Sequence, residues 1–263
     1  MLVSHWSDSP VVSFVQCFFL AWGCQLLDSQ AIRQNNLRLR LRRCTTETAV
    51  FCDFDGTITC VDATDAVLEA FALPAWRDWE QRWVNDEITS QECLSRQIEL
   101  IQADQETLIR FAKDLPIDEG IFALDRRCTE EGIPLTIVSD GIDLLVEAVL
   151  RRHNLLHLPV YSNHLRWNET GRPSLSFPFA VQECESGAGT CKCALTLPTD
   201  SSFSRTVYIG DGRSDQCVSA KMQTVFAKGT LREWCEVQGI TYLPFETLTD
   251  VAERIFSKEA LIS

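Results

Sequence analysis

The sequence predicts an α/β fold in which a parallel sheet is sandwiched by helices. Three apolar runs of strand length, residues 49–54, 135–138 and 206–209, suggest this architecture. Each run is almost continuously hydrophobic, as expected for a parallel strand that is covered on both faces. Helical segments separate the later runs, and such alternation is typical of the βαβ units of a Rossmann-like sheet.

The elements after residue 116 follow this alternation. Apolar spacing predicts helices at 118–131, 142–152 and 215–222, and further strands at 224–227 and 241–245. Gly132 directly follows the first of these helices, where glycine is a common stop signal. The sheet is therefore expected to have at least the strands named so far, with a helix after most of them.

A helical segment interrupts the alternation directly after the first strand. Residues 61–116 show no strand signal, and 63–71, 76–84 and 92–101 have amphipathic helical spacing. An insertion at this point lies naturally above the carboxyl ends of the strands, so we expect residues 61–116 to form a small helical cap. The alternative is a helical subdomain that does not contact the substrate.

The N-terminal region, residues 1–45, differs from the rest of the chain. No charged residue lies between Asp8 and Asp28, and five arginines without an acid follow at 33–43. A secretory signal has the reverse order, with basic residues first. A membrane anchor stays open, because the apolar run approaches spanning length; we favour an appendage outside the fold. The α/β core is then expected at 46–60 and 117–258.

The composition favours small soluble substrates. The net charge is −13, from 37 acidic and 24 basic residues, which disfavours nucleic acid because phosphate backbones are bound by Lys- and Arg-rich surfaces. Apolar residues make up 45% of the 263 residues, so a full core is available. The twelve cysteines are therefore not needed as a disulfide scaffold, and we expect a reducing, cytoplasmic compartment.

Polar side chains follow the predicted strands at the point where each one ends. Asp53 and Asp55 close the first run, Ser139 follows the second and Asp211 the third. In open α/β sheets the ligand lies outside these carboxyl ends. Several carboxylates beside buried strands are costly without a partner, so a cation is expected. Mg²⁺ fits because it takes oxygen ligands and needs only one or two carboxylates.

The carboxylates at 53 and 55 suggest phosphoryl transfer. Asp53, at the tip of a buried strand, is placed to attack phosphorus and form an acyl phosphate. Asp55 points to the same face of an extended strand. From there it can protonate the leaving group and then deprotonate the water that hydrolyses the intermediate. Asp53 and Asp55 are therefore the catalytic candidates, together with Lys192.

A phosphate site is expected around these acids. Glycine at 56 allows a sharp turn without a side chain, hydroxyls and amides act as donors, and Lys192 supplies positive charge to the phosphoryl oxygens. The predicted phosphate-binding residues are Gly56, Thr57, Ser139, Asp140, Gly141 and Lys192. Asp215 is expected to orient a water or to pair with Lys192. Taken singly, each motif is also explained by a turn or a helix cap.

Together these motifs resemble the haloacid dehalogenase superfamily of phosphotransferases. Residues 53–57 (DFDGT) match its first motif, Ser139 the second, Lys192 the third and residues 210–215 (GDGRSD) the fourth. The similarity spans about residues 49–230, with the helical insertion where the phosphoserine-phosphatase-like branch (subfamily IB) has its small cap.

The resemblance implies a role for each matched residue. Asp53 would be the nucleophile and Asp55 the acid and base, and Mg²⁺ would be held by Asp53, the Asp55 carbonyl and Asp211. Asp62 falls where that branch often has an acid that faces the substrate. A carboxylate at 55 also favours phosphomonoesterases over dehalogenases and transport ATPases.

A narrower resemblance concerns residues 187–193 (GAGTCKC) and 161–165 (YSNHL). Methionine-salvage phosphatases, which act on a methylthio enol phosphate, are similar there. The chain departs from them at 139–141 (SDG) and 210–212 (GDG). The expected function is hydrolysis of a small phosphorylated metabolite, with a methionine-salvage-type enol phosphate as one candidate. The alternatives are a phosphoserine, phosphocholine or phosphoethanolamine phosphatase, or a non-catalytic protein that binds a phosphorylated metabolite.

The cysteines around Lys192 leave two interpretations open. Cys184, Cys191 and Cys193 could hold a metal ion, although their spacing is not that of a standard zinc pair. Alternatively, they pack and shape the loop that positions Lys192.

Overall fold

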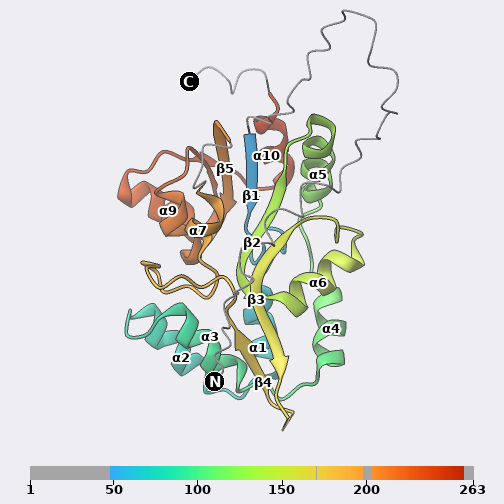
Figure 1. The fold of residues 1–263 in the computed structure, drawn as a ribbon, viewed down its shortest axis with the longest axis vertical. Helices are drawn as coiled ribbons and strands as arrows, with labels where there is room; N and C mark the ends of the chain where they lie inside the picture. The colour runs from blue at the N-terminus through green and yellow to red at the C-terminus, as the bar shows by residue number, and fades with distance from the viewer. Residues whose placement is uncertain (1–47, 170, 198–202, 258–263) are drawn as a thin grey trace, which may run out of the picture. The chain divides into compact units, whose positions relative to one another are not determined.

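The computed structural model describes residues 48–169, 171–197 and 203–257. Its centre is a seven-stranded sheet in the order β4-β3-β2-β1-β5-β6-β7 (Figure 1). The strands are β1 (Thr48–Cys52), β2 (Leu135–Ile142), β3 (Val160–Trp167), β4 (Pro173–Ser176), β5 (Arg205–Gly210), β6 (Thr224–Ala227) and β7 (Leu243–Pro244). All neighbouring strands pair in parallel except β3 and β4, which are antiparallel. The predicted α/β sheet is confirmed.

Helices connect the strands. They are α1 (Ala63–Phe71), α2 (Trp76–Val84), α3 (Ser90–Ile98), α4 (Gln105–Lys113), α5 (Gly120–Glu131), α6 (Asp143–Arg152), α7 (Lys192–Thr196), α8 (Gln216–Ser219), α9 (Gly229–Gln238) and α10 (Leu248–Ile255). A short 3₁₀ turn, Arg213–Asp215, precedes α8. Within the described ranges, no helix is long and apolar enough to span a membrane. The predicted appendage at 1–45 lies outside the described residues.

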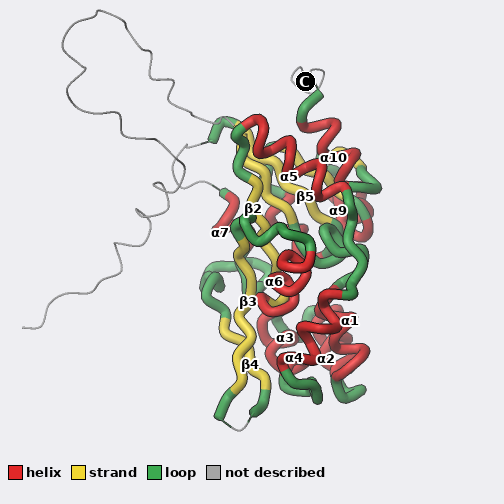
Figure 2. Tube along the Cα trace, turned by 90° about the vertical axis from the view of Figure 1, so that its right-hand side faces the viewer, coloured by secondary structure: helices red, strands yellow, loops and turns green. Residues whose placement is uncertain are grey.

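The central strands are buried on both faces, as their continuous apolar runs predict. Val50 and Cys52 of β1 belong to the large core cluster that includes residues of α5, α6 and α10. The alternate residues Ala49 and Phe51 contact a second cluster, to which α7 and α8 contribute Leu195, Val218 and others. Figure 2 shows α7 on one side of the strands and α5, α6 and α10 on the other. Every residue of β1 after Thr48 is therefore buried.

Several helix ends follow from local capping. Asp62 accepts a hydrogen bond from the Asp65 amide at 2.8 Å and so begins α1. Thr89 does the same for α3 through the Glu92 amide at 3.1 Å, two residues earlier than predicted. Gly132, with φ of 66°, ends α5 in the left-handed conformation that suits glycine. The caps of α1 and α5 explain why these two helices nearly coincide with the predicted segments.

The structure corrects the prediction in the second half of the sheet. The hairpin of β3 and β4 was missed because β3 carries polar residues, such as the buried Asn163 and the half-buried His164. The second strand does not end at residue 138: β2 continues to Ile142 with an irregular register between Val138 and Ile142. The predicted strand 241–245 shortens to Leu243–Pro244. Helices α4, α9 and α10 were also not predicted.

The four helices of the insertion, α1 to α4, share the core of the sheet. Val67 and Leu68 of α1 and Leu108 of α4 lie in the same hydrophobic cluster as Ile137 of β2 and Leu145 of α6. Figure 1 shows α1, α2 and α3 at the end of the sheet toward which the arrow of β3 points. The insertion is therefore packed against the sheet at the carboxyl ends of its strands.

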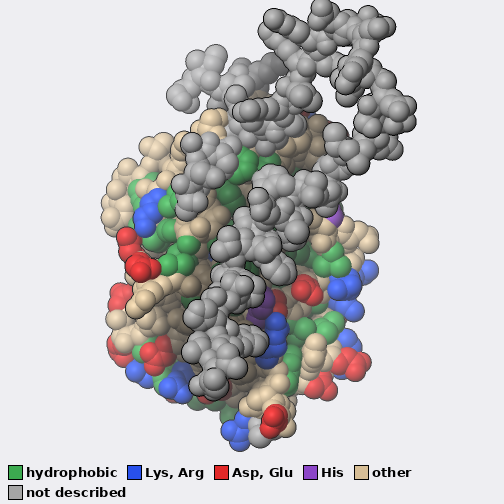
Figure 3. All heavy atoms as spheres, viewed as in Figure 1, with side chains coloured by type: hydrophobic (Ala, Val, Ile, Leu, Met, Phe, Trp, Pro, Cys, Tyr) green, Lys and Arg blue, Asp and Glu red, His purple; other side chains and the backbone are tan. Residues whose placement is uncertain are grey.

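The surface carries both signs of charge. On the face shown in Figure 3, Lys and Arg side chains are interspersed with Asp and Glu side chains around the lower rim. Mixed charge of this kind is typical of a solvated surface.

Candidate active site

Three neighbouring strands bring the predicted acids together. β1 lies between β2 and β5, with Cys52 opposite both Ile137 and Ile209. Asp53 directly follows β1, and its amide donates a hydrogen bond of 2.9 Å to the Ile209 carbonyl. From β1 the strand order continues through β2 on one side and through β5 on the other. Ligands usually bind at the carboxyl end of the strands at such a switch point in an α/β sheet.

The carboxylates of Asp53, Asp211 and Asp215 form one compact group. One oxygen of each lies within 4.8 Å of the others. Within the described ranges this is the one group of His, Cys, Asp and Glu side chains that meets the spacing of a metal site. Burial, followed by the charge of Asp215, raises the pKa of Asp53 well above its usual value. Burial and Asp215 also raise the pKa of Asp211 to about 6.

Lys192, the first residue of α7, is the buried cation of the site. Its Nζ lies 2.8 Å from Asp53 Oδ1 and 2.5 Å from Asp215 Oδ1, and it donates to Ser214 Oγ at 2.9 Å. Burial opposes its charge, but Asp215 and Asp53 together raise the pKa of Lys192 above its usual value. The ammonium is therefore held in its charged form between two carboxylates.

Asp215 anchors this arrangement. Its Oδ1 accepts the Tyr208 hydroxyl at 2.5 Å, and its Oδ2 accepts the backbone amides of Asp211 and Gly212 at 2.9 and 3.0 Å. Although burial acts in the opposite direction, the Lys192 ammonium and these donors lower the pKa of Asp215 below its usual value. The predicted pairing of Asp215 with Lys192 is present in the structure.

The site fits a magnesium ion. Its donors are carboxylate oxygens, which Mg²⁺ prefers, and the raised pKa values of Asp53 and Asp211 indicate negative charge without enough compensation. Gly56 leaves the necessary room: it has φ of 71°, and a Cβ atom there would lie 2.3 Å from Asp211 Oδ2. Thr57 orients the same carboxylate by donating to Asp211 Oδ1 at 2.9 Å.

Asp55 lies beside this group and is held by two donors. Ser139 Oγ donates to Asp55 Oδ2 at 3.0 Å, and the Ala63 amide donates to Oδ1 at 2.9 Å. Gly141 is required here, because a Cβ atom at 141 would lie 2.2 Å from Asp55 Oδ2. Burial first, and then the charge of Asp62, raise the pKa of Asp55 to about 7. This carboxyl group is thus able to exchange a proton near neutral pH.

Asp140 has a different environment from its predicted neighbours. Its side chain accepts hydrogen bonds from Ser90 Oγ at 2.7 Å, the Thr190 amide at 2.8 Å and Asn163 Nδ2 at 3.1 Å. These partners come from α3, the loop before α7 and β3. The carboxylate therefore ties the insertion to the sheet and to the segment that carries Lys192, because both of its oxygens accept hydrogen bonds from these segments.

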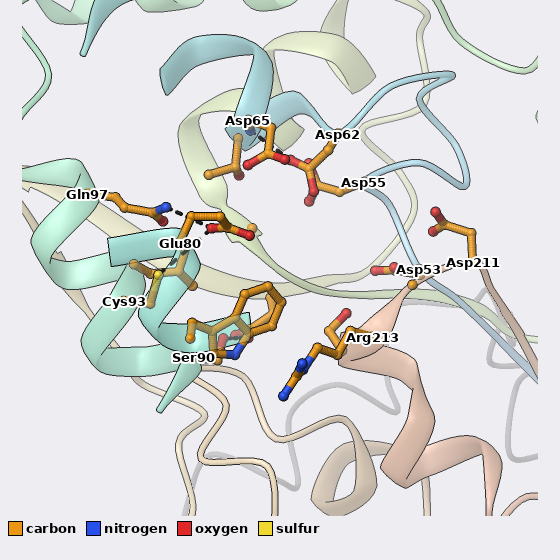
Figure 4. Close-up of a pocket in the computed structure, with 17 residues that line it drawn as sticks. Asp53, Asp55, Asp62, Asp65, Glu80, Ser90, Cys93, Gln97, Asp211 and Arg213 are labelled. Carbon is orange, nitrogen blue, oxygen red and sulfur yellow. Dashed lines mark hydrogen bonds between the residues drawn. The ribbon is translucent and has the colours of Figure 1, made fainter. Parts of the chain in front are cut away.

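A cavity of about 150 Å³ opens from the carboxylates of Asp53, Asp55 and Asp211 toward the inserted helices. Asp62 and Asp65 of the α1 end and Glu80 of α2 face the same space as Asp53 and Asp211 (Figure 4). Desolvation by the surrounding protein, followed by the charge of Asp65, raises the pKa of Asp62 to about 7, although Asp62 is exposed. The predicted proximity of Asp62 to the site is present, and the insertion lines the cavity.

The far wall of the cavity contains Glu80 and Gln97, which the sequence did not single out. Glu80 accepts a hydrogen bond of 2.8 Å from Gln97 Nε2, and Gln97 is 2% exposed. Arg213 stacks over the Trp83 ring at 5.0 Å and donates to the Val84 carbonyl at 3.2 Å. These contacts depend on how α2 and α3 pack against each other. The sequence indicated them only through polar residues that lie within otherwise amphipathic helices.

The cysteines form contacts other than the predicted metal set. Among the described residues, Cys184, Cys191 and Cys193 do not make up a group with metal-site spacing. The sulfur of Cys193 instead lies 3.2 Å from that of Cys217. Cys191 is buried, while Cys184 and Cys193 are half-buried. This geometry favours the second interpretation, in which the cysteines pack around the Lys192 segment.

Comparison with known proteins defines the family. The family model described as "Putative Phosphatase" matches residues 48–229. The chain belongs to this family. Two of its curated relatives are the 2-hydroxy-3-keto-5-methylthiopentenyl-1-phosphate phosphatases of Brevibacillus brevis and Geobacillus kaustophilus. The first is 30% identical and covers 77% of this chain and 92% of its own; the second is 30% identical and covers 83% and 100%.

Solved structures agree on the fold of this putative phosphatase family member. A phosphoserine phosphatase from T. onnurineus has a TM-score of 0.59 at 14% identity and covers 82% of this chain and 98% of its own. A HAD family hydrolase from Salmonella enterica serovar Typhi has a TM-score of 0.60 at 14% identity, with coverages of 81% and 72%. The chain is therefore a phosphatase with the haloacid dehalogenase fold, as the sequence motifs predicted.

Proposed function

We propose that the protein is a Mg²⁺-dependent phosphomonoester hydrolase that works through an aspartyl phosphate on Asp53. One observation carries this proposal: the buried Asp53 carboxylate lies 2.8 Å from the Lys192 ammonium and within 4.8 Å of Asp211. A nucleophile, a fixed positive charge and a second carboxylate for a cation thus meet at one point. Asp53, Asp211 and the Asp55 carbonyl would hold the ion, which would neutralise charge on the phosphoryl oxygens.

In the first step, an oxygen of Asp53 attacks phosphorus and the bond to the leaving oxygen breaks. Asp55, held by Ser139 and the Ala63 amide, donates its proton to that oxygen. Lys192 stabilises the negative charge of the phosphoryl group. In the second step, Asp55 takes a proton from water, the water oxygen attacks phosphorus, and Asp53 leaves as a carboxylate. The backbone around Gly56 and Gly141 supplies further donors.

Phosphate release from p-nitrophenyl phosphate tests this function. We expect turnover with Mg²⁺, and only background release after chelation with EDTA. Asp211→Asn should raise the Mg²⁺ concentration needed for half-maximal rate by roughly tenfold or more, because one charge-assisted contact to the ion is lost. Asp114→Asn, which changes an exposed acid on the surface, serves as the control.

A rate that is the same with and without Mg²⁺ would contradict the metal requirement. Absence of release by the wild type under every condition would favour the alternative of a protein that binds a phosphorylated metabolite without turnover.

The proposed substrate class rests on the relatives and on the cavity. An enol phosphate with a methylthio group is the first candidate, because the curated relatives that cover most of the chain bear that name. Cys93 and Leu94 line the cavity and suit an apolar thioether. The Asp62, Asp65 and Glu80 carboxylates favour a second candidate, an amine-bearing phosphomonoester such as phosphoserine, phosphocholine or phosphoethanolamine.

Glu80→Gln separates these candidates. If the substrate carries an ammonium group with N–H donors, as phosphoserine and phosphoethanolamine do, loss of the carboxylate should raise its KM by about tenfold or more, since a hydrogen bond to a charged group contributes about 1.5–3 kcal/mol. The KM of a phosphomonoester without an ammonium group should stay within a factor of about two. Steady-state kinetics on a panel of phosphomonoesters measures this, with the exposed Glu99→Gln as the control. Equal KM changes for substrates with and without an ammonium group would contradict a contact between Glu80 and that group.

The pKa of Asp55 predicts the pH dependence of the first step. Its carboxyl group, with a pKa of about 7, holds the required proton below that pH and loses it above. We therefore expect kcat/KM for an alkyl phosphomonoester to fall as the pH rises through about 7. Asp55→Asn should lower kcat/KM by about 10²–10⁴-fold and remove this limb of the profile. The loss should be smaller with p-nitrophenyl phosphate, whose leaving group needs less protonation; an equal loss would contradict the role of Asp55 as acid.

A further inference from the structure

We propose that Cys193 and Cys217 form a redox modification site, at which peroxide produces a reversible disulfide between α7 and α8. The two sulfurs lie 3.2 Å apart and are not bonded. This separation is only about 1 Å longer than a disulfide bond of about 2.05 Å. The two residues come from different segments, so this closeness is produced by the packing of α7 against α8 and not by the chain itself.

The surroundings leave both sulfurs partly accessible to solvent. Cys193 packs against the cluster around Tyr208 and Val218 on one side. Cys217 Sγ lies 3.3 Å from Lys221 Nζ and 3.4 Å from Glu185 Oε2, and Lys221 and Glu185 form an ion pair at 3.3 Å. Both cysteines are half-buried, whereas Glu185 is 72% exposed. A small oxidant can therefore reach the pair from the solvent side.

The bond would join the two segments that hold the buried ion pair of the site. Cys193 directly follows Lys192, and Cys217 lies two residues after Asp215. Drawing the sulfurs together moves α7 and α8 relative to each other, and with them the Lys192 ammonium relative to Asp53. Because displacements of about 1 Å in a catalytic group can reduce rates by about 10²-fold, we expect the oxidised protein to be less active.

The chemistry needs only a peroxide as oxidant. The sulfur of one thiol attacks a peroxide oxygen, the O–O bond breaks, and a sulfenic acid and water form. The second sulfur then attacks the sulfenic sulfur, the S–O bond breaks, and the oxygen leaves as a second water. In total the two thiols lose two protons and two electrons, which reduce the peroxide to two molecules of water. A thiol reductant restores both cysteines by disulfide exchange. When disulfides occur in reducing compartments, they are usually transient and act in catalysis or redox sensing.

Peptide mapping tests the site independently of the proposed phosphatase function. The protein is treated with hydrogen peroxide, free thiols are alkylated, and trypsin is added without reductant. The expected product links the peptide 193–205 to the peptide 214–221, each of which contains one cysteine. It should disappear after dithiothreitol and be absent from Cys193→Ser and Cys217→Ser. Persistence of both residues as alkylated thiols, or their conversion to sulfinic acids without the link, would overturn the proposal.

The neighbouring thiols provide the matched control. Cys184 and Cys191 also interact with each other, and a bond between them would stay inside one tryptic peptide that ends at Lys192. Cys184→Ser should therefore leave the 193–217 link unchanged. Turnover of p-nitrophenyl phosphate gives the second readout: the linked protein should be slower by about tenfold or more and recover with dithiothreitol. A fully linked protein that retains its rate would overturn the coupling to the site.

Discussion

Asp53→Asn should abolish turnover while leaving the protein folded. The amide cannot act as the nucleophile, and loss of the nucleophile in an enzyme with a covalent intermediate reduces kcat by roughly 10⁴-fold or more. The substitution keeps the shape of the side chain. It also removes a carboxylate whose pKa is raised by burial and by Asp215, so the neutral amide relieves electrostatic repulsion. We therefore expect the metal-free variant to melt at the same temperature as the wild type or higher.

Two measurements check this expectation. Steady-state kinetics with p-nitrophenyl phosphate gives the loss in kcat, and thermal unfolding in EDTA gives the change in stability. The exposed Asp114→Asn should match the wild type in both. A variant at 53 that retains more than about a hundredth of the wild-type kcat would exclude Asp53 as the nucleophile, because an essential nucleophile cannot be replaced by its amide at so small a cost.

Lys192→Met should have the largest effect on stability. Lys192 is 3% exposed and contacts both Asp53 and Asp215. Its removal leaves buried carboxylates without their cation, and breaking such a pair costs about 3–5 kcal/mol. Turnover should also fall, by roughly 10²-fold or more, because the positive charge that stabilises the phosphoryl oxygens is lost. Lys113→Met, on the exposed side of α4, controls for the change in total charge.

The double variant Lys192→Met with Asp215→Asn separates the two roles of Lys192. Neutralising Asp215 removes one of the unpaired carboxylates, so the double variant should recover part of the lost free energy of unfolding and none of the lost activity. Chemical denaturation measures the first quantity and steady-state kinetics the second. If the losses in stability of the two single variants simply add up in the double variant, Lys192 and Asp215 are not energetically coupled. That result would contradict a stabilising role for the 2.5 Å contact between them.

The sequence was informative where strand ends determine position. Asp53 and Asp211 each directly follow an apolar parallel strand, and carboxyl ends of neighbouring parallel strands must meet at one edge. The order of β2, β1 and β5 in the sheet then places the acids together. Lys192 was predicted from its motif, and its 2.8 Å contact with Asp53 is a result of the structure.

Other features depend on packing that no local pattern specifies. Asp140 as a phosphate-binding residue stays a prediction; its hydrogen-bond partners Ser90, Asn163 and Thr190 come from three distant segments, which the sequence did not indicate. Strand β3 was missed because its polar residues, among them Ser162, Asn163 and His164, weaken the hydrophobic signal. Glu80 faces the cavity only because of the rotation of α2, which periodicity alone does not determine.

The location of the covalent intermediate tests the central claim most directly. Borohydride reduces an acyl phosphate to an alcohol, so an aspartyl phosphate trapped during turnover becomes homoserine, which mass spectrometry can place in the sequence. We predict homoserine at position 53, present only when both substrate and Mg²⁺ are supplied and enriched in Asp55→Asn, in which hydrolysis of the intermediate is slowed. Modification at any other residue, or none during rapid turnover, would contradict the account.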